Sequence, residues 1–90
     1  MTVDEFMRKP KNMDIMEYEK LIDDLHRAEK KVRNISINID FCKDALDILT
    51  GENDIDRAVK KQEELDKLLA DKNKWVEKID RINKAINFED

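Results

Sequence analysis

The chain has 90 residues, 18 Lys and Arg against 22 Asp and Glu, a net charge of −4, and one each of Gly, Pro, Cys and His. One Gly cannot build a phosphate-binding loop, and one Cys with one His cannot complete a zinc site on a single chain. The acidic balance also argues against non-specific nucleic-acid binding, which needs a basic surface. We therefore expect one small domain with no catalytic residue, no metal and no cofactor.

The near-absence of turn-forming residues predicts long helices. Sheets need turns, and turns mostly use Gly, Pro or Asn-Gly. Here 44% of the residues are charged, with both signs mixed, and the apolar residues recur at a helical period. The predicted fold is all-α: a long antiparallel helical hairpin, coiled-coil-like, preceded by a short N-terminal helix and expected to assemble into an oligomeric helix bundle.

Residues 1–12 are predicted to form the short N-terminal helix and a linker. Thr2 and Glu5 have the spacing of a capping box, and Pro10 ends the helix after about two turns. The helix carries a small apolar patch, formed by Val3, Phe6 and Met7. Charges interrupt residues 1–10, so we expect no signal peptide, and no apolar stretch approaches the roughly 20 residues of a membrane span.

A heptad seam predicts the first long helix, over about 14–49. Its apolar residues recur at alternating steps of three and four, and no Gly or Pro interrupts them. The helix would be about 54 Å long at 1.5 Å per residue. The seam consists of Tyr18, Leu21, Leu25, Ala28, Val32, Ile35, Ile39, Cys42, Leu46 and Leu49.

A loop over 50–53 separates this helix from a second one, over about 54–87, and the hairpin as a whole occupies 13–90. We expect Gly51 to be the left-handed residue that ends the first helix. Asn53 or Asp54 is expected to cap the second helix. The short connection requires the two helices to be antiparallel neighbours.

Folding the helices about this loop pairs residues whose numbers sum to 103 or 104. Leu49 then meets Ile55, and Ala28, the smallest residue of the seam, meets Trp75, the largest residue of the other helix. Lys72 falls opposite Val32, where we expect it to extend outward over the indole ring and pair with Glu29. The alternative is that Lys72 specifies the register or the oligomeric state. In the same register Cys42 is predicted to face either of two polar residues, Lys61 or Gln62.

Four apolar residues of the first helix lie outside the seam and predict a partner-binding face. They are about 120° from the seam centre on a helical wheel, and large exposed apolar patches mark interfaces. Three occupants are open: the N-terminal apolar patch folding back, a second copy of the chain, or a foreign protein, of which we favour self-association. The four residues are Ile37, Phe41, Ala45 and Ile48.

Charged residues gather in two places. The middle of the hairpin carries a possible anion-binding belt, formed by Lys30, Lys31, Arg33, Lys72, Lys74 and Lys78. Lys and Arg donate to phosphate, but acidic residues lie among them, so ordinary helix ion pairs also explain the pattern. The hairpin tip is acidic and could be a cation site, a dock for a basic partner or a solvated face: Asp40, Asp44, Asp47, Glu52, Asp54 and Asp56.

The remaining candidate groups favour structural roles. Asp23 and His26 have the spacing of only half of a di-iron helix motif. Cys42 is a seam residue without a nearby base, so we expect a buried thiol, and a lone Cys indicates a reducing, cytoplasmic setting. Trp75 is expected to pack in the core, with stacking on a nucleobase as the alternative.

These observations predict a non-enzymatic protein-interaction module, a small adaptor or inhibitor that docks through the apolar helix face. Short chains of this composition are common in phages and mobile elements, where they block or redirect host proteins. The main alternative is an oligomeric sponge that sequesters an anionic, cyclic nucleotide between Lys and Arg belts. A structural or scaffold component and a DNA mimic are further alternatives, and we expect neither a membrane nor a nucleic acid as partner.

Overall fold

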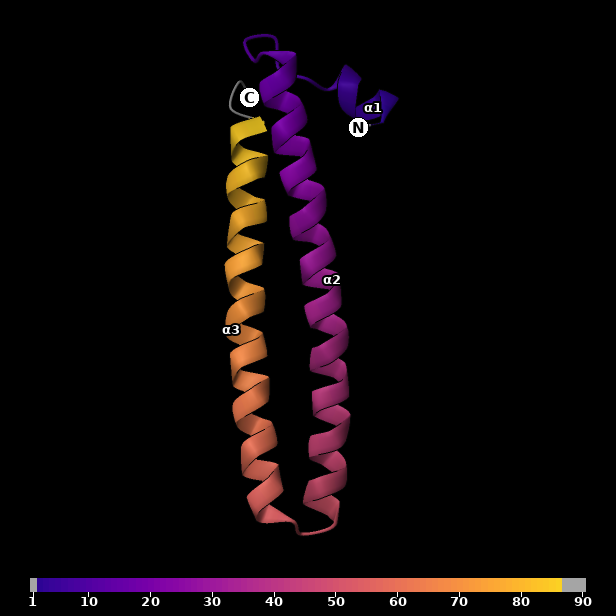
Figure 1. Cartoon of the computed structure of the whole chain (residues 1–90), viewed down its shortest axis with the longest axis vertical. Helices are drawn as coiled ribbons and strands as arrows, with labels where there is room; N and C mark the ends of the chain where they lie inside the picture. The colour runs from indigo at the N-terminus through magenta and orange to yellow at the C-terminus, as the bar shows by residue number, and fades with distance from the viewer. Residues whose placement is uncertain (1, 87–90) are drawn as a thin grey trace.

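The computed structural model describes residues 2–86, which form three helices (Figure 1). The short helix α1 (Val3–Met7) precedes α2 (Ile15–Gly51) and α3 (Ile55–Ile86), and no strand occurs in this part of the chain. Helices α2 and α3 run antiparallel along a molecule of 59 × 20 × 19 Å. The predicted all-α hairpin with a short N-terminal helix is confirmed. Asn87, the expected last residue of the second helix, lies outside the described residues.

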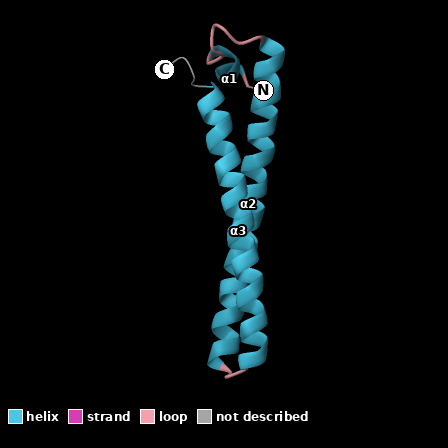
Figure 2. Cartoon of the chain, turned by 90° about the vertical axis from the view of Figure 1, so that its left-hand side faces the viewer, coloured by secondary structure: helices cyan, strands magenta, loops and turns pink. Residues whose placement is uncertain are grey.

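The interface between α2 and α3 is the heptad seam that the sequence predicts. Its centre is a buried cluster against which Leu46, Leu68 and Trp75 pack: Ile35, Ile39, Cys42 and Leu65. The other predicted seam positions of α2, from Tyr18 to Leu49, are buried or half-buried as well. Figure 2 shows the two helices twisting about each other, as a 3.5-residue repeat requires.

The register of the hairpin agrees with the sequence at its centre and differs at the loop. Ala28 is completely buried, and Trp75 is half-buried in the same seam. Lys61, and not Gln62, occupies the seam position near Cys42, because Lys61 is half-buried whereas Gln62 is exposed. Ile55 and Leu49 line one hollow, but the expected seam position of Ile55 is wrong, since this side chain is 72% exposed. The alternating steps of the α3 seam reach residue 54, which leaves Ile55 about 100° off the seam.

The loop also differs from the prediction in its left-handed residue. Gly51 stays in the last turn of α2, and Asn53 has the positive φ, 59°. The backbone N–H of Asp54 donates to the Leu49 carbonyl (3.0 Å), and that of Asn53 donates to the Thr50 carbonyl (3.2 Å). This is a Schellman motif, and Asn tolerates the left-handed region, so α2 continues to Gly51. The Asp54 carboxylate accepts a backbone N–H three residues later at 3.4 Å, as expected of the cap of α3.

Helix α1 docks on α2 at the end opposite the loop. The predicted capping box forms, with the Thr2 N–H donating to Glu5 Oε1 (2.9 Å) and the Glu5 N–H donating to Thr2 Oγ1 (3.2 Å). The Tyr18 hydroxyl donates to the Glu5 backbone carbonyl, and Glu5 Oε2 lies 2.7 Å from His26 Nε2. Tyr18 and Ile22 are buried. Tyr18, Ile22 and His26 are four residues apart, so α1 meets one continuous face of α2.

The contacts of α1 are mainly polar. The hydrogen bond from the Thr2 backbone, followed by the contact with His26, holds the pKa of Glu5 below its usual value of 4.5. Burial, followed by the charge of Glu5, raises the pKa of Tyr18 above 10. In the connection to α2, Lys9 Nζ donates to the carbonyls of Met13 (2.6 Å) and Pro10 (3.1 Å). A set of directional bonds therefore holds α1 in place.

The apolar patch of α1 does not cover the spare apolar face of α2. Val3, Phe6 and Met7 remain exposed. The last contact of α1 is at His26, whereas the spare face begins at Ile37, about 16 Å further along the helix. Of the three occupants that the sequence left open, the N-terminal patch is thereby excluded.

Candidate functional site

The spare apolar residues of α2 form an exposed stripe on a rigid helix. Ile37, Phe41 and Ile48 are 53%, 70% and 61% exposed, and Ala45 between them is half-buried. Steps of four, four and three residues keep these side chains on one face. The four residues are called the apolar stripe below. Its exposure means that the hairpin alone does not bury the largest apolar side chains of this half of α2.

A groove between α2 and α3 runs beside the apolar stripe. It has a volume of about 530 Å³, and it is lined by Asn38, Phe41, Cys42, Ala45, Lys61, Glu64 and Leu68. Phe41 and Ala45 belong to both the stripe and the groove, so the two features form one continuous surface. Apolar walls with a few polar groups are typical of surfaces that bind other molecules.

The polar side of this groove is an ion pair. Lys61 Nζ donates to Glu64 Oε2 at 2.9 Å, and the Cys42 thiol lies 3.8 Å from the same carboxylate oxygen. The hydrogen bond from Lys61 holds the pKa of Glu64 low, and the same bond raises the pKa of Lys61. Cys42 is buried, as predicted. The groove therefore presents a fixed charge pair next to an apolar wall.

A basic hollow lies on the same side of the hairpin, one to two helical turns nearer the termini. Its volume is also about 530 Å³, and its lining is Asp24, Arg27, Lys30, Lys31, Asn34, Trp75 and Lys78. Lys78 Nζ lies 5.1 Å from the centre of the Trp75 ring, within the range of a cation–π contact. Arg27 pairs with Asp24 at 3.7 Å. This set of residues is called the basic hollow below.

The structure brings only part of the predicted anion-binding belt together. Lys30, Lys31 and Lys78 line the basic hollow, and Lys74 lines an adjoining hollow on the outer side of α3. Arg33 follows Lys31 by two residues, about 200° around the helix, and so it points away. Lys72 is half-buried in the seam. Arg27, which the sequence analysis missed, completes the group, since it precedes Lys31 by one helical turn.

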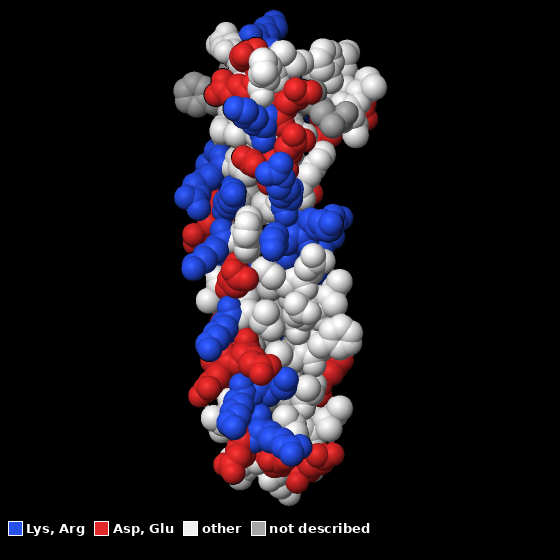
Figure 3. All heavy atoms as spheres, viewed as in Figure 1, with Lys and Arg blue, Asp and Glu red and all other residues white. Residues whose placement is uncertain are grey.

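The apolar and basic regions are consecutive on one face of the molecule. Figure 3 shows a broad uncharged area over the loop half of α2, with basic side chains gathered above it on the same helix. Asn34 of the basic hollow and Asn38 of the groove are one turn apart. A molecule that binds along α2 would therefore meet first a positively charged and then an apolar surface.

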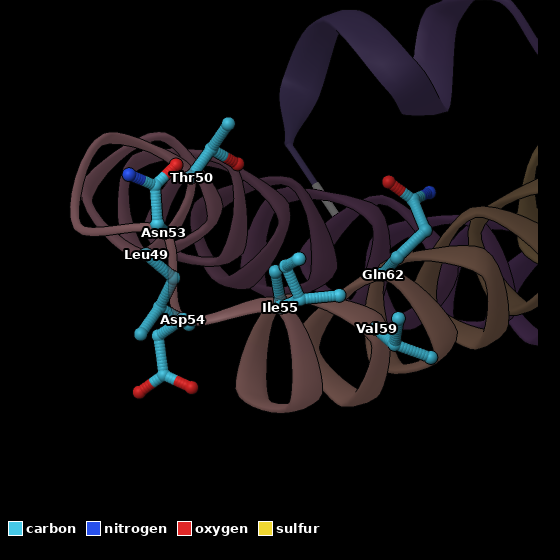
Figure 4. A pocket seen from close by; sticks show the side chains of 8 residues that line it. Leu49, Thr50, Asn53, Asp54, Ile55, Val59 and Gln62 are labelled. Atoms are coloured by element: carbon cyan, nitrogen blue, oxygen red, sulfur yellow. The ribbon is translucent and has the colours of Figure 1, made fainter.

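A second apolar hollow lies at the hairpin tip, on the other side of the seam. Figure 4 shows Ile55 and Val59 of α3 beside the end of α2. Gln62 lines this tip hollow and Glu64 lines the groove, about 200° away around α3. The tip hollow is lined by Leu49, Thr50, Asn53, Asp54, Ile55, Ala58, Val59 and Gln62. This tip hollow was not predicted, because Ile55 was expected in the seam.

The histidine takes part in tertiary packing. His26 contacts Glu5, from which it is separated by 21 residues, and this contact was not predicted. Within residues 2–86, no three His, Cys, Asp or Glu side chains gather closely enough to hold a metal ion. Over the same range, no helix combines the length and the apolar character needed to cross a membrane.

Comparison with known proteins assigns no family to the chain. No protein-family model, no curated protein and no solved structure matches it. Among its surfaces, the apolar stripe with its groove has the largest exposed apolar side chains on a continuous helix.

Proposed function

We propose that the protein is a non-enzymatic interaction module that binds another protein chain through the apolar stripe and the adjoining groove. The observation that carries this proposal is the exposure of Ile37, Phe41 and Ile48 on one face of a continuous helix. Apolar area contributes about 25 cal/mol per Å² when it is buried. Burial of this face by a partner would therefore be favourable, because its apolar side chains would leave water.

Binding would follow the helix-to-groove or helix-to-bundle mode. A partner helix that lies along α2 would place its own apolar residues between Phe41 and the groove wall at Leu68. Phe41 is the expected energetic centre, because aromatic anchors near the middle of an interface contribute most. The Lys61–Glu64 pair would set the orientation of the partner through charge, more than it would add affinity.

The test is a double substitution on the stripe, Ile37→Asp/Phe41→Asp. We expect it to abolish partner binding in pull-down and calorimetric experiments, because two carboxylates cannot be desolvated in an apolar interface. Val59→Asp is the matched control, since Val59 is also exposed but lies at the tip hollow. A stripe variant that kept the native partners and the native oligomeric state would refute the proposal.

A second candidate function rests on the basic hollow. Arg27, Lys30, Lys31 and Lys78 surround a half-buried indole ring, which is the residue set for an anionic ligand with an aromatic ring, such as a nucleotide. A sponge for cyclic nucleotides would use two such hollows in an oligomer. Charge reversal by Lys30→Glu/Lys78→Glu, at two residues that line the hollow, should eliminate thermal shifts produced by a nucleotide panel. Absence of any shift with the wild-type protein would discard this function.

The finer parts of the function stay predictions. They are the inhibitor role, an origin in a phage or mobile element, the cytoplasmic setting and the alternative as a scaffold component. Each of these predictions depends on the identity of the partner. A partner that binds the wild-type chain and not the stripe variant is the one to identify. A scaffold would lose its assembly in the stripe variant, whereas an inhibitor would lose its target.

A further inference from the structure

We infer that the partner on the apolar stripe is a second copy of this chain, with the two α2 helices antiparallel across a two-fold axis between Phe41 and Ala45. The inference rests on the proposed function, because it names the occupant of the same face. Three properties of the face support it: the spacing of the stripe, the distribution of charge and the available area.

The spacing of the stripe is self-complementary. In the antiparallel arrangement Phe41 meets Ala45 of the second copy, and Ile37 meets Ile48 of the second copy, because each pair has numbers that sum to 85 or 86. A two-fold interface requires this reciprocity. The largest side chain of the stripe thus meets the smallest, which fills space at constant density. Parallel helices would instead place Phe41 on its own symmetry mate and leave a gap at Ala45.

The face carries opposite charges on the two sides of the axis. Lys30 and Lys31 precede the axis by about 12 residues, and Glu52, directly after α2, follows it by about nine. These separations are roughly 18 Å and 14 Å along the helix. Antiparallel pairing therefore brings the basic end of each copy over the acidic tip of the other, and flexible Lys side chains close the remaining offset. Such matching of potentials fixes the register of a complex.

The same axis gives complementary charges on α3. The seam register places the axis level with Lys61, so Arg57, which pairs with Asp54 of its own chain at 3.5 Å, meets Glu64 of the second copy. Lys61 itself lies next to its symmetry mate. The Glu64 carboxylate at 2.9 Å from its ammonium group reduces that repulsion. The α3 side of the face thus favours the antiparallel arrangement as the α2 side does.

The face is large enough for a stable dimer. The hairpin is about 20 Å wide, and the distance from Lys30 to Gly51 along α2 is about 32 Å. The product is roughly 630 Å² on each copy, at the lower end of the roughly 600–1,000 Å² per partner of a standard interface. On the opposite side of α3, Gln62 and Asp66, joined by a hydrogen bond of 3.0 Å, separate the exposed Ile55 and Val59 from the exposed Leu69 and Val76.

Disulfide cross-linking tests the geometry directly. In a Cys42→Ala background, we expect Ile37→Cys chains mixed with Ile48→Cys chains to form a disulfide-linked dimer. The Ile37→Cys chains alone should not cross-link. Native mass spectrometry of the wild-type chain should show twice the 10.7 kDa mass of the monomer. Cross-linking of Ile37→Cys to itself would indicate parallel helices and overturn the inference, as would a wild-type monomer at about 100 μM.

A charge swap is the second test, and it leaves the apolar stripe intact. One variant carries Lys31→Glu and Arg57→Glu, and the other carries Glu52→Lys and Glu64→Lys. Each should form homodimers about tenfold more weakly than the wild type, because like charges then face each other. Their mixture should form heterodimers about as well as the wild type. Equal preference for homodimers and heterodimers would overturn the antiparallel arrangement.

The inference and the proposed function fail in different ways. If the wild-type chain is monomeric but Ile37→Asp/Phe41→Asp loses an identified foreign partner, the self-pairing is wrong and the stripe is still the binding face. If the chain dimerises and the stripe variant remains a dimer with unchanged affinity, both are wrong. Circular dichroism of each variant confirms that the helices persist.

Discussion

The two halves of the hairpin differ in how their outer faces are covered, although α2 runs through both as one helix. In the terminal half α1 lies on α2, and Ile22 is only 3% exposed. In the loop half no segment of residues 2–86 covers Ile37, which is 53% exposed. The two side chains are the same residue type in the same helix. Whether an apolar residue off the seam belongs to the core or to an exposed face thus depends on whether another segment of the chain covers it.

The strongest test of this comparison replaces both isoleucines. Ile22→Ala should lower the free energy of unfolding by about 2–4 kcal/mol, because it leaves a cavity where the buried side chain was. Ile37→Ala should change it by about 0.5 kcal/mol or less in dilute solution, since the side chain is already hydrated there. Urea unfolding followed by circular dichroism measures both values. Equal losses would show that the two halves are covered alike.

A smaller effect is expected from the polar contact that positions α1. Tyr18→Phe removes the hydrogen bond to the Glu5 carbonyl and should lower the free energy of unfolding by about 1 kcal/mol. Release of α1 should also speed trypsin cleavage after Arg8. Phe41→Tyr, in the loop half, is the control and should leave the cleavage rate unchanged. Unaltered cleavage in Tyr18→Phe would mean that α1 does not depend on this bond.

At the loop end, the backbone of α2 can be tested by one added methyl group. Gly51 is helical, and a Cβ there meets nothing within 4 Å. Gly51→Ala should therefore stabilise the protein by about 0.5–1 kcal/mol. The Schellman motif at Asn53 predicts that Asn53→Gly is tolerated too. A thermal unfolding midpoint that falls in Gly51→Ala would restore Gly51 as the left-handed residue.

The smallest effect is the pH dependence of the terminal half. The pKa of Glu5 is lowered by the Thr2 backbone hydrogen bond and by the contact with His26. The folded pKa is below that of the unfolded chain, so the contribution to stability is complete above pH 4.5 and is lost as the pH falls through the folded value. NMR titration of the Thr2 and Glu5 amides should show this transition below pH 4.5. A midpoint above 4.5 would contradict the docking contacts.

The seam could be predicted because it depends on short-range order. A step of three or four residues places side chains on one helix face whatever surrounds the helix, and the short loop leaves antiparallel packing as the sole arrangement. The pairing of Ala28 with Trp75 then follows from the register. The error at Gly51 has a local cause. Gly51 and Asn53 can each take the left-handed conformation that ends a helix, and α2 adopts the longer of the two possible helices, with Asn53 as the left-handed residue.

The candidate site could be predicted only in part. The apolar stripe was evident from residues that the seam does not use, and the structure leaves it exposed. The basic hollow could not be predicted as a unit, because its residues come from both helices. Arg33 and Lys72 are also basic, but they do not lie on the side of the hairpin that forms the hollow. Trp75 belongs to both the core and the basic hollow, and the sequence alone does not tell which of its ring faces is buried and which lines the hollow.

By itself the sequence determined the helices, their antiparallel pairing and the apolar stripe, because all three follow from periodicity and from a short connection. The tertiary structure alone decided where α1 lies. Its contacts with Tyr18 and His26 span 13 and 21 residues and depend on single hydrogen bonds. Such bonds leave no periodic pattern in a sequence, since any of several polar residues could satisfy them once two segments have met.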